Sequence, residues 1–290
     1  MTIIENLIET QEFATLPNIA SKILNMLEND ETDIRKISEV IEADASLTLK
    51  LLRIANSPLY STKTEINSIH QAIITLGLNR LTNIVLGVSI FSKFLFTTNK
   101  ELKKLVEKFW WHTACTGMVS KSLTSKLGLF YKETEFIGGL LHDIGKMAMM
   151  QYSPVEYMKV IDKVENHGFL DIDAEEEVFG VAHPKVGAEI ANLWKLPLNL
   201  TNIIEYHTIP SESDNDKELI AIVRVADLLT ELWGAGFYEG IKKLELEKHD
   251  AWQVLSSSEE KIENLDLEIL TFDLEKDFEN TSLFLNTIIS

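Results

Sequence analysis

The sequence predicts an all-α protein, and three observations support this fold class. Apolar residues recur at three- and four-residue steps through most of the chain, as in the face formed by Ile84, Val88 and Phe91. Alternation with a period of two, bounded by turns, is missing, and dipeptides typical of hairpins are scarce. Signals for helix starts and ends recur along the chain. At 10–14 residues per helix, we expect about a dozen helices or more.

Individual helix boundaries can be located from capping residues. Ser68–Gln71 has the pattern of a capping box, and Gly77 is placed to end the helix that follows. Ser153–Glu156 has the same pattern, with proline at the first helical position. His183-Pro184 and Leu196-Pro197 indicate two further starts, and Asn166–Gly168 indicates an end. The segment from 211 to 217 is polar and typical of a loop.

Length and charge restrict the classes of protein. The chain has 290 residues, with 27 Lys and Arg against 45 Asp and Glu, for a net charge of −18. An acidic balance disfavours nucleic acid and anionic membranes as partners, since phosphates attract clustered Lys and Arg. The N-terminus has no basic start or unbroken apolar stretch, so we expect no secretory signal, no membrane span and a cytoplasmic protein. The only cysteine, Cys115, fits a reducing compartment and excludes a thiolate metal cluster.

We predict three parts: residues 1–98, an N-terminal helical part with few chemical groups; residues 99–240, a helical bundle that holds most of the histidines; and residues 241–290, an acidic helical extension. The extension carries 12 acids and 5 lysines, a net charge of −7. Its periodic apolar residues, Leu265, Ile269 and Phe272, predict a packed helix rather than disorder.

The clearest chemical signal is the segment Gly138–Lys146, which contains His142 and Asp143. Neighbouring side chains of these types can converge on one metal ion. Lys146 follows on the same helical face and could hold a metal-bound phosphate. Taken alone, such a dipeptide is more often part of a helix surface, with Asp143 paired to Lys146 and His142 in solvent.

Other candidate residues lie outside this segment. Asp227 interrupts an apolar helical face, where a buried acid needs a partner or a metal, although Arg224 three residues earlier offers an ordinary surface ion pair. His112, His183 and His207 are the further candidates, each more often structural when taken singly. A lysine stripe on one predicted helix, interrupted by glutamates, is better explained as a solvated face than as a nucleic-acid site; its members are Lys100, Lys103, Lys104 and Lys108, with Lys121 and Lys126 further along.

These residues stand in a sequence that resembles the HDOD family, a regulatory branch of the HD superfamily of metal-dependent phosphohydrolases. The resemblance starts at Leu16-Pro17 and continues through Ile41–Thr48, Leu51–Pro58 and Ile69–Gly77 to Tyr206-His207. The Gly139–Lys146 segment is the part shared with the wider HD superfamily. The resemblance implies an N-terminal helical subdomain packed on an HD-like helical bundle, here with a C-terminal helical extension.

The resemblance also implies a metal site. The HD ligand series corresponds to His112, His142, Asp143 and Asp227, and two-metal relatives add histidines that correspond to His183 and His207. The chain departs from the HD-GYP phosphodiesterases, which have a second histidine and a glutamate where Tyr206 and Thr208 stand. A glutamate of three-metal members corresponds to Lys108. We therefore expect one ion rather than two, and no hydrolysis of cyclic di-GMP.

Two functions from different classes follow. The favoured one is a stand-alone HDOD regulator in bacterial signal transduction, not an enzyme, which acts through protein partners and keeps its metal site; a homodimer and a phosphate-containing ligand stay open. The alternative is a metal-dependent phosphohydrolase, with Asp143 and Lys146 in the catalytic set and a nucleotide or another phosphoester as substrate. The imidazole–carboxylate set suits Fe, Mn, Ni or Zn.

Overall fold

The protein is helical throughout the part of the chain that the computed structural model describes, which is residues 15–28, 33–57, 60, 64–94, 102–238, 243–258 and 260–279. No strand occurs within these ranges, and the predicted all-α class is confirmed. The N-terminal residues up to 14, together with Pro58 and Lys100, lie outside the described residues.

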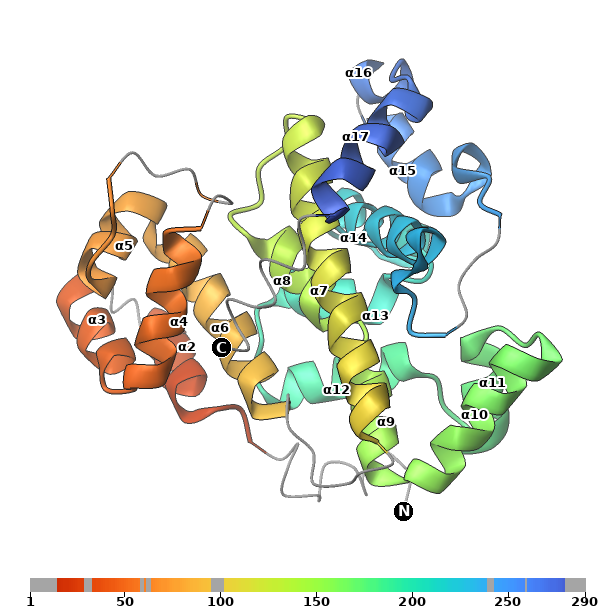
Figure 1. The fold of residues 1–290 in the computed structure, drawn as a ribbon, viewed down its shortest axis with the longest axis horizontal. Helices are drawn as coiled ribbons and strands as arrows, with labels where there is room; N and C mark the ends of the chain where they lie inside the picture. Colours follow the sequence, from red (N-terminus) through yellow and green to blue (C-terminus); the bar gives the residue numbers. More distant parts are fainter. Residues whose placement is uncertain are drawn as a thin grey trace.

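In the described residues of the N-terminal part, five helices lie together at one side of the molecule (Figure 1). They are α2 (Asn18–Glu28), α3 (Ile34–Glu42), α4 (Ala45–Ala55), α5 (Ile69–Leu76) and α6 (Leu78–Phe94). Their buried apolar side chains belong to the same hydrophobic core as those of the following bundle. The N-terminal subdomain is therefore packed on the bundle, as predicted.

Local capping explains several boundaries of these helices. Asp33 and Asp44 accept hydrogen bonds from the backbone N–H groups of Arg35 and Leu47, each at 2.9 Å. The Ser68 hydroxyl accepts from the Gln71 N–H at 3.1 Å, and Gly77, at φ 94°, ends that helix in a backbone conformation that favours glycine. The capping box and the helix end predicted there are confirmed.

The bundle is arranged around the long helix α7 (Figure 1). Its helices are α7 (Lys103–Lys126), α8 (Thr134–Leu141), α9 (Ile144–Tyr152), α10 (Pro154–His167), α11 (Asp171–Phe179), α12 (His183–Leu193), α13 (Leu198–Tyr206) and α14 (Lys217–Thr230). Gly139 lets α8 approach α7 closely, because a Cβ there would lie 2.6 Å from the Gly117 Cα. The starts predicted at His183 and near Pro197, and the end at Gly168, are confirmed.

The second predicted capping box is only half right. The helix begins at Pro154, but Ser153 makes no side-chain capping bond. The Glu156 carboxylate instead accepts a hydrogen bond from Lys159 at 2.8 Å on the helix surface. The proline, with its fixed φ, therefore marks this start without the hydroxyl.

A buried ionic cluster joins the N-terminal part to the bundle. Glu133 is 1% exposed and precedes α8 with φ 71°. Its carboxylate binds the Lys121 ammonium at 2.8 Å, the Arg80 Nε at 3.1 Å and the Tyr60 hydroxyl at 3.0 Å. Arg80 lies on α6 and Lys121 on α7, so this seam cluster links the two parts through one carboxylate.

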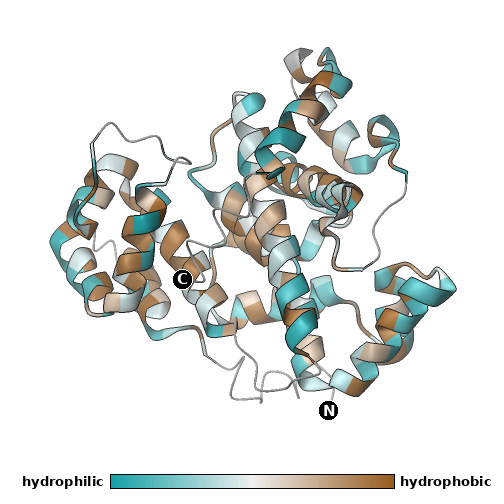
Figure 2. Ribbon diagram, viewed as in Figure 1, coloured by the Kyte–Doolittle hydropathy of each residue, from teal (hydrophilic) through white to brown (hydrophobic). Residues whose placement is uncertain are grey.

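The C-terminal extension packs on α7 and α14. After the π-helical turn η2 (Glu231–Ala235) come η3 (Leu246–Lys248), α15 (Asp250–Ser258), α16 (Glu260–Glu263) and α17 (Leu267–Glu279). A helix is confirmed here, but the predicted packing face is wrong. Leu265, Ile269 and Phe272 are 37%, 62% and 58% exposed, whereas Leu270 and Leu274 of α17 are buried. Hydrophobic and hydrophilic residues alternate along the helices of this lobe (Figure 2).

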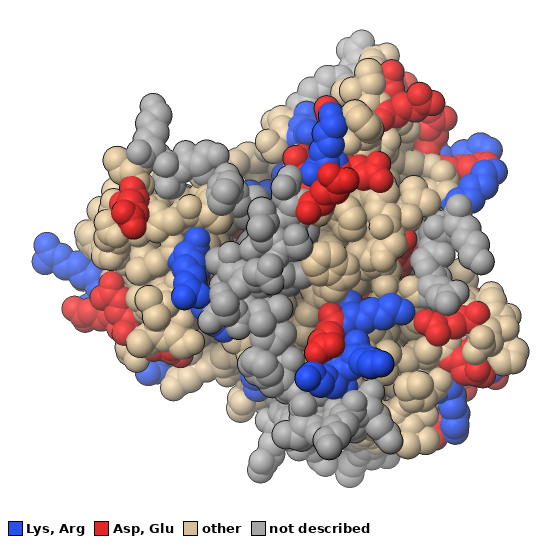
Figure 3. All heavy atoms as spheres, in the orientation of Figure 1, with Lys and Arg blue, Asp and Glu red and all other residues tan. Residues whose placement is uncertain are grey.

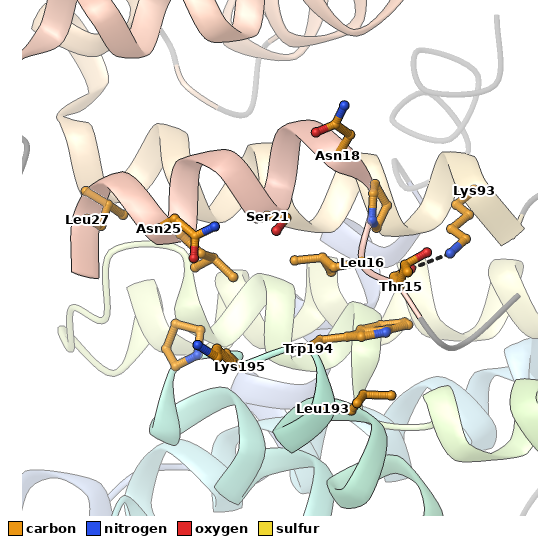
Figure 4. A pocket seen from close by; sticks show the side chains of 13 residues that line it. Thr15, Leu16, Asn18, Ser21, Asn25, Leu27, Lys93, Leu193, Trp194 and Lys195 are labelled. Carbon is orange, nitrogen blue, oxygen red and sulfur yellow. Dashed lines mark hydrogen bonds between the residues drawn. The ribbon is translucent and has the colours of Figure 1, made fainter. Parts of the chain in front are cut away.

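A cavity of about 920 Å³ lies between α2 and the turn that joins α12 to α13 (Figure 4). Asn25, Ser21 and Leu16 lie on one side of it and Trp194 on the other. None of the seven candidate site residues lines this cavity. Among the described residues, none of the helices combines the length and the apolar composition that a bilayer crossing requires.

Candidate metal centre

The six predicted metal ligands meet in the interior of the bundle. His112 comes from the middle of α7, His142 and Asp143 from the junction of α8 and α9, and Asp227 from α14. His183 is the first residue of α12, and His207 follows α13 directly. All six side chains are 0–3% exposed. The tertiary fold therefore brings together residues that span more than a hundred positions of the chain.

Asp143 lies at the middle of this metal centre. Its Oδ2 atom is 3.6 Å from the His112 Nε2 and 3.5 Å from the His142 Nε2. Its Oδ1 atom is 3.1 Å from the His183 Nε2 and 3.5 Å from the His207 Nε2. One carboxylate thus faces two pairs of histidines, one pair through each oxygen.

Asp227 closes the centre on the side of α14. Its Oδ1 atom is 3.1 Å from the His112 Nε2 and 3.6 Å from the His142 Nε2. Its Oδ2 atom binds the Arg224 guanidinium at 2.5 Å, so the predicted pair with Arg224 also exists. The ion pair with Arg224 therefore exists, but Asp227 is buried and not on the helix surface, and its other oxygen faces the histidines.

The four histidines are oriented alike. The Nδ1 atoms of His112, His142 and His207 lie 3.0, 2.7 and 3.0 Å from the backbone oxygens of Ala235, Gly139 and Ile204. The His183 Nδ1 lies 2.7 Å from a Glu175 oxygen. Since these oxygens accept, each Nδ1 carries a proton. All four Nε2 atoms therefore point toward the centre, where each can bind a metal ion when it is unprotonated. Acceptors of this kind orient histidines that bind metal ions.

Two buried oxygens test whether a metal ion suits these residues. The Oδ1 atoms of Asp143 and Asp227 are buried and accept no hydrogen bond. Leaving such acceptors unsatisfied is costly, and a cation is a natural partner for them. Two sets of three residues place their ligand atoms within 4.8 Å of one another: His112, His142 and Asp227, and His142, Asp143 and His207. The residues present therefore fit a divalent metal ion with nitrogen and oxygen ligands.

Neighbouring groups of opposite charge shift the pKa values of the acids and histidines in the centre. Burial disfavours ionisation of Asp143, but His142, Lys146 and His183 outweigh it and hold its pKa well below the usual range. Burial lowers the pKa of His183, but Glu175 and Asp143 raise it to about 9. The pKa of His207 falls to about 4, chiefly through burial. A ligating imidazole must be neutral, so metal binding through His183 requires loss of its proton.

Lys146 does not lie on the surface. It is 4% exposed, and its ammonium is 2.9 Å from the Asp143 Oδ2 and 2.8 Å from the Asp171 Oδ2. Burial opposes its charge, but the two carboxylates raise its pKa well above the usual value. The helix-surface interpretation of Asp143, with His142 in solvent, is therefore wrong for this chain. Lys146 neutralises the centre from the side of α11.

Sequence reasoning missed the acids that support the centre. Glu175 is fully buried, and its Oε2 accepts hydrogen bonds from both the backbone N–H (2.8 Å) and the Nδ1 (2.7 Å) of His183. Asp171, one turn earlier on α11, binds Lys146. Both belong to an acid-rich stretch of the sequence, and such a stretch is typical of a solvent-exposed helix face. Their spacing of four residues was the one available signal that they share a direction.

One departure from the catalytic relatives, Lys108, lies on the surface of α7. Lys108, at the position of a glutamate in three-metal members, has a side chain 43% exposed and 3.7 Å from Glu165. Three other lysines of the predicted basic stripe pair with acids: Lys103 with Glu107 at 3.9 Å, Lys121 with Glu133 at 2.8 Å and Lys126 with Asp277 at 3.4 Å. These pairs disperse the positive charge of the stripe.

Fold and centre together define a class: a helical protein with a buried cluster of histidines and carboxylates, as the resemblance to HD proteins implies. The HDOD domain family model matches residues 13–210. The chain belongs to the HDOD family.

Two curated relatives match this chain over part of their length. The chain is 26% identical over 218 residues to an uncharacterised protein of Treponema pallidum (strain Nichols). The aligned region covers 73% of this chain and 42% of that protein. It is 37% identical over 60 residues to the uncharacterised protein YuxH of Bacillus subtilis (strain 168), covering 21% of this chain and 15% of YuxH. The chain thus spans less than half the length of the curated relatives it matches.

Solved structures share the whole fold. The crystal structure of an HDOD domain protein with unknown function from Geobacter sulfurreducens has a TM-score of 0.73 and 25% identity, covering 93% of this chain and 92% of that one. A Shewanella amazonensis SB2B structure named "Putative phosphohydrolase" has a TM-score of 0.68 and 22% identity, covering 93% and 94%. At that identity, the second likeness shows the fold alone.

Proposed function

We propose that this chain is a regulatory HDOD protein whose metal centre binds one divalent ion and whose output is contact with another protein. One observation carries the proposal: the six ligands and Lys146 are all between 0% and 4% exposed. Hydrolysis requires a substrate phosphate to reach the ligands. A structural ion requires only the side chains that hold it.

The state of Lys146 supports the same proposal. In a phosphohydrolase this ammonium would contact the phosphate, but here it lies between the carboxylates of Asp143 and Asp171. Release toward a substrate would break both contacts and leave two buried carboxylates without that partner, which is costly. Lys146 therefore acts as a charge partner of the centre.

A bound ion would be held by His112, His142, Asp143 and Asp227. When bound, it supplies positive charge to two buried carboxylates and joins α7, the α8–α9 junction and α14. His183 and His207 face the other oxygen of Asp143 and add two nitrogen donors. Because the unfolded chain does not preassemble these residues, metal binding stabilises the folded state.

Metal content and thermal stability test the proposal. Elemental analysis of the purified protein is expected to find about one Fe, Mn, Ni or Zn ion per chain, and a chelator is expected to lower the Tm. His142→Ala removes both the ion and the response to chelator. His167→Ala, whose side chain is 60% exposed on α10, is the matched control and retains both. A wild-type protein without metal, with a Tm that no divalent ion raises, contradicts the proposed metal.

The second candidate function is a metal-dependent phosphohydrolase. The mixed imidazole–carboxylate set and the unsatisfied Oδ1 atoms of Asp143 and Asp227 favour it. When bound, a metal in such a set supplies Lewis-acid chemistry toward a phosphoester. A screen with bis(p-nitrophenyl) phosphate and nucleotides in the presence of Mn²⁺ or Fe²⁺ separates the two functions. Turnover that Asp143→Asn abolishes and His167→Ala preserves would replace the regulatory proposal.

A further inference from the structure

Helix α17 presents apolar side chains on two opposite faces. Leu270 and Leu274 point into the protein and are 7% and 0% exposed. Ile269 and Phe272, three residues apart, are 62% and 58% exposed on the other face. The inner face anchors α17 on α7. The outer face leaves large apolar side chains in water on a helix that otherwise carries charge, and such patches mark interaction sites.

Two adjoining cavities extend this outer face into a groove. One, of about 400 Å³, lies between η3 and α17, and the other, of about 300 Å³, lies beside it toward the end of α14. Both cavities are lined by Leu244, Leu246, Glu268 and Thr271, so they are continuous. Leu229, Leu232, Trp233 and Phe272 complete the apolar lining of the second cavity. We call this feature the C-terminal groove.

Acidic side chains border the C-terminal groove. Glu268 and Glu275 line it from α17, and Glu245 and Glu247 line it from the segment opposite together with one cation, Lys248, which is paired with Glu245. Among the described residues, no Lys or Arg lies within salt-bridge distance of Glu268 or Glu275, whereas Glu245 is paired with two lysines. On the face in view, acidic side chains gather at the outer edge of the lobe around α15–α17, with Lys and Arg side chains beside them (Figure 3). An apolar floor with an acidic border is complementary to an apolar stripe flanked by basic residues.

Charge also separates the candidate occupants. A second copy of the chain would bring acid against acid, since α17 carries five Asp and Glu and a single Lys. Nucleic acid and anionic membranes are disfavoured for the same reason. An amphipathic helix with apolar residues at three- and four-residue spacing can place them in such a groove. Lys and Arg beside that stripe would reach the glutamates.

We propose that the C-terminal groove docks a basic amphipathic helix of a partner protein, with Phe272 as an apolar contact and Glu268 and Glu275 as charge contacts. The proposal rests on the regulatory function proposed above and names the surface and the partner chemistry through which it acts. The groove is separate from the metal centre, because none of the six metal ligands lines either cavity.

The probe for this proposal is a synthetic 18-residue helix of Leu and Lys, with Leu at three- and four-residue spacing. Its binding to the full chain is measured by calorimetry at two salt concentrations. A peptide with the same Leu positions and Glu in place of Lys is the charge control. We expect the Lys peptide to bind, with affinity that falls at higher salt, and the Glu peptide not to bind. Equal binding of the two peptides overturns the proposal.

Matched variants locate the binding. Phe272→Ser and the pair Glu268→Lys with Glu275→Lys are each expected to weaken binding of the Lys peptide by about tenfold or more. Ile74→Ser, at a side chain 66% exposed on α5, and the pair Glu39→Lys with Glu42→Lys on α3 are the controls and keep wild-type affinity. Equal losses in groove and control variants show nonspecific attraction and overturn the proposal.

The experiments distinguish a failure of the groove proposal from a failure of the proposed metal centre. The charge-reversal pair lies on the surface and keeps α17 folded, so it tests the groove even if Phe272→Ser unfolds the lobe. Light scattering gives the oligomeric state, and a wild-type dimer that Phe272→Ser dissociates would assign the groove to a second copy. Metal content measured on the same samples keeps the outcomes apart, since loss of peptide binding with the ion retained refutes only the groove.

Discussion

Glu135 gives a quantitative prediction about the seam between the N-terminal part and the bundle. It lies in the first turn of α8, is 5% exposed, and its Oε2 atom has no hydrogen-bond partner. Burial, and after it the charge of nearby Glu133, raise the pKa of Glu135 from 4.5 to about 7. The perturbation is Glu135→Gln, which keeps the shape of the side chain and removes its titration.

The pKa shift sets both the sign and the size of the effect. Between pH 4.5 and 7 the unfolded chain loses the proton of this carboxyl while the folded chain keeps it, so the unfolded state binds fewer protons and stability falls as pH rises. The stabilisation is fully present below pH 4.5 and lost above pH 7. A shift of about 2.5 pKa units, at about 1.4 kcal/mol per unit, corresponds to about 3 kcal/mol.

Urea denaturation of wild type and Glu135→Gln between pH 5 and 8.5 measures this effect. Near pH 5 the two proteins should have similar unfolding free energies, and at pH 8.5 the variant should be more stable by up to about 3 kcal/mol. Glu107→Gln, at a side chain 63% exposed on α7, is the matched control and should follow wild type at every pH. Parallel pH profiles for wild type and Glu135→Gln would refute the assignment of a raised pKa to this carboxyl.

Three further predictions concern packing and charge. Gly145→Ala places a Cβ 2.1 Å from the backbone oxygen of His183, and since backbone cannot yield cheaply, calorimetry should show a loss of about 3 kcal/mol together with loss of metal; a variant with wild-type Tm would be inconsistent with the helix contact. Glu175→Gln, which removes the charge behind His183, should weaken metal binding about 10–100-fold in a competition titration, while Glu176→Gln, on the exposed face of α11, should leave it unchanged. Glu133→Ala leaves two cations at the seam without their shared carboxylate, which is 1% exposed, and should cost about 3–5 kcal/mol in denaturant unfolding; an unfolding free energy equal to that of wild type would contradict a stabilising role of this cluster.

Much of the fold could be read from the sequence because its signals are local. A proline at the first helical turn fixes φ, and a glycine beyond the last turn accepts positive φ, whatever surrounds them. The starts at Pro154 and His183 and the end at Gly168 are accordingly confirmed. The face of α17 was misjudged because Ile269 and Phe272 on one side and Leu270 and Leu274 on the other are both apolar. Periodicity identifies a helix but cannot choose between two apolar faces.

Only part of the candidate metal centre could likewise be predicted from the sequence. The ligand types and their order were visible in the sequence, through the resemblance to HD proteins. The orientation of the Lys146 side chain could not be predicted from the sequence, because its second partner, Asp171, lies on another helix. Glu175 was hidden for the same reason: in the sequence it belongs to an acidic run, and only the approach of α11 to the start of α12 buries it against His183.

By itself, the sequence determined the all-α class, several helix starts and ends, the family and the chemical type of the centre, since each depends on residue identity and short-range spacing. Only the tertiary structure decided that His112, His142, His183 and His207 turn their Nε2 atoms toward two aspartates. It also decided that Lys146 is buried and that the outer face of α17 borders a groove. These properties depend on which helices approach one another, and contacts between distant segments set burial, desolvation and charge pairing.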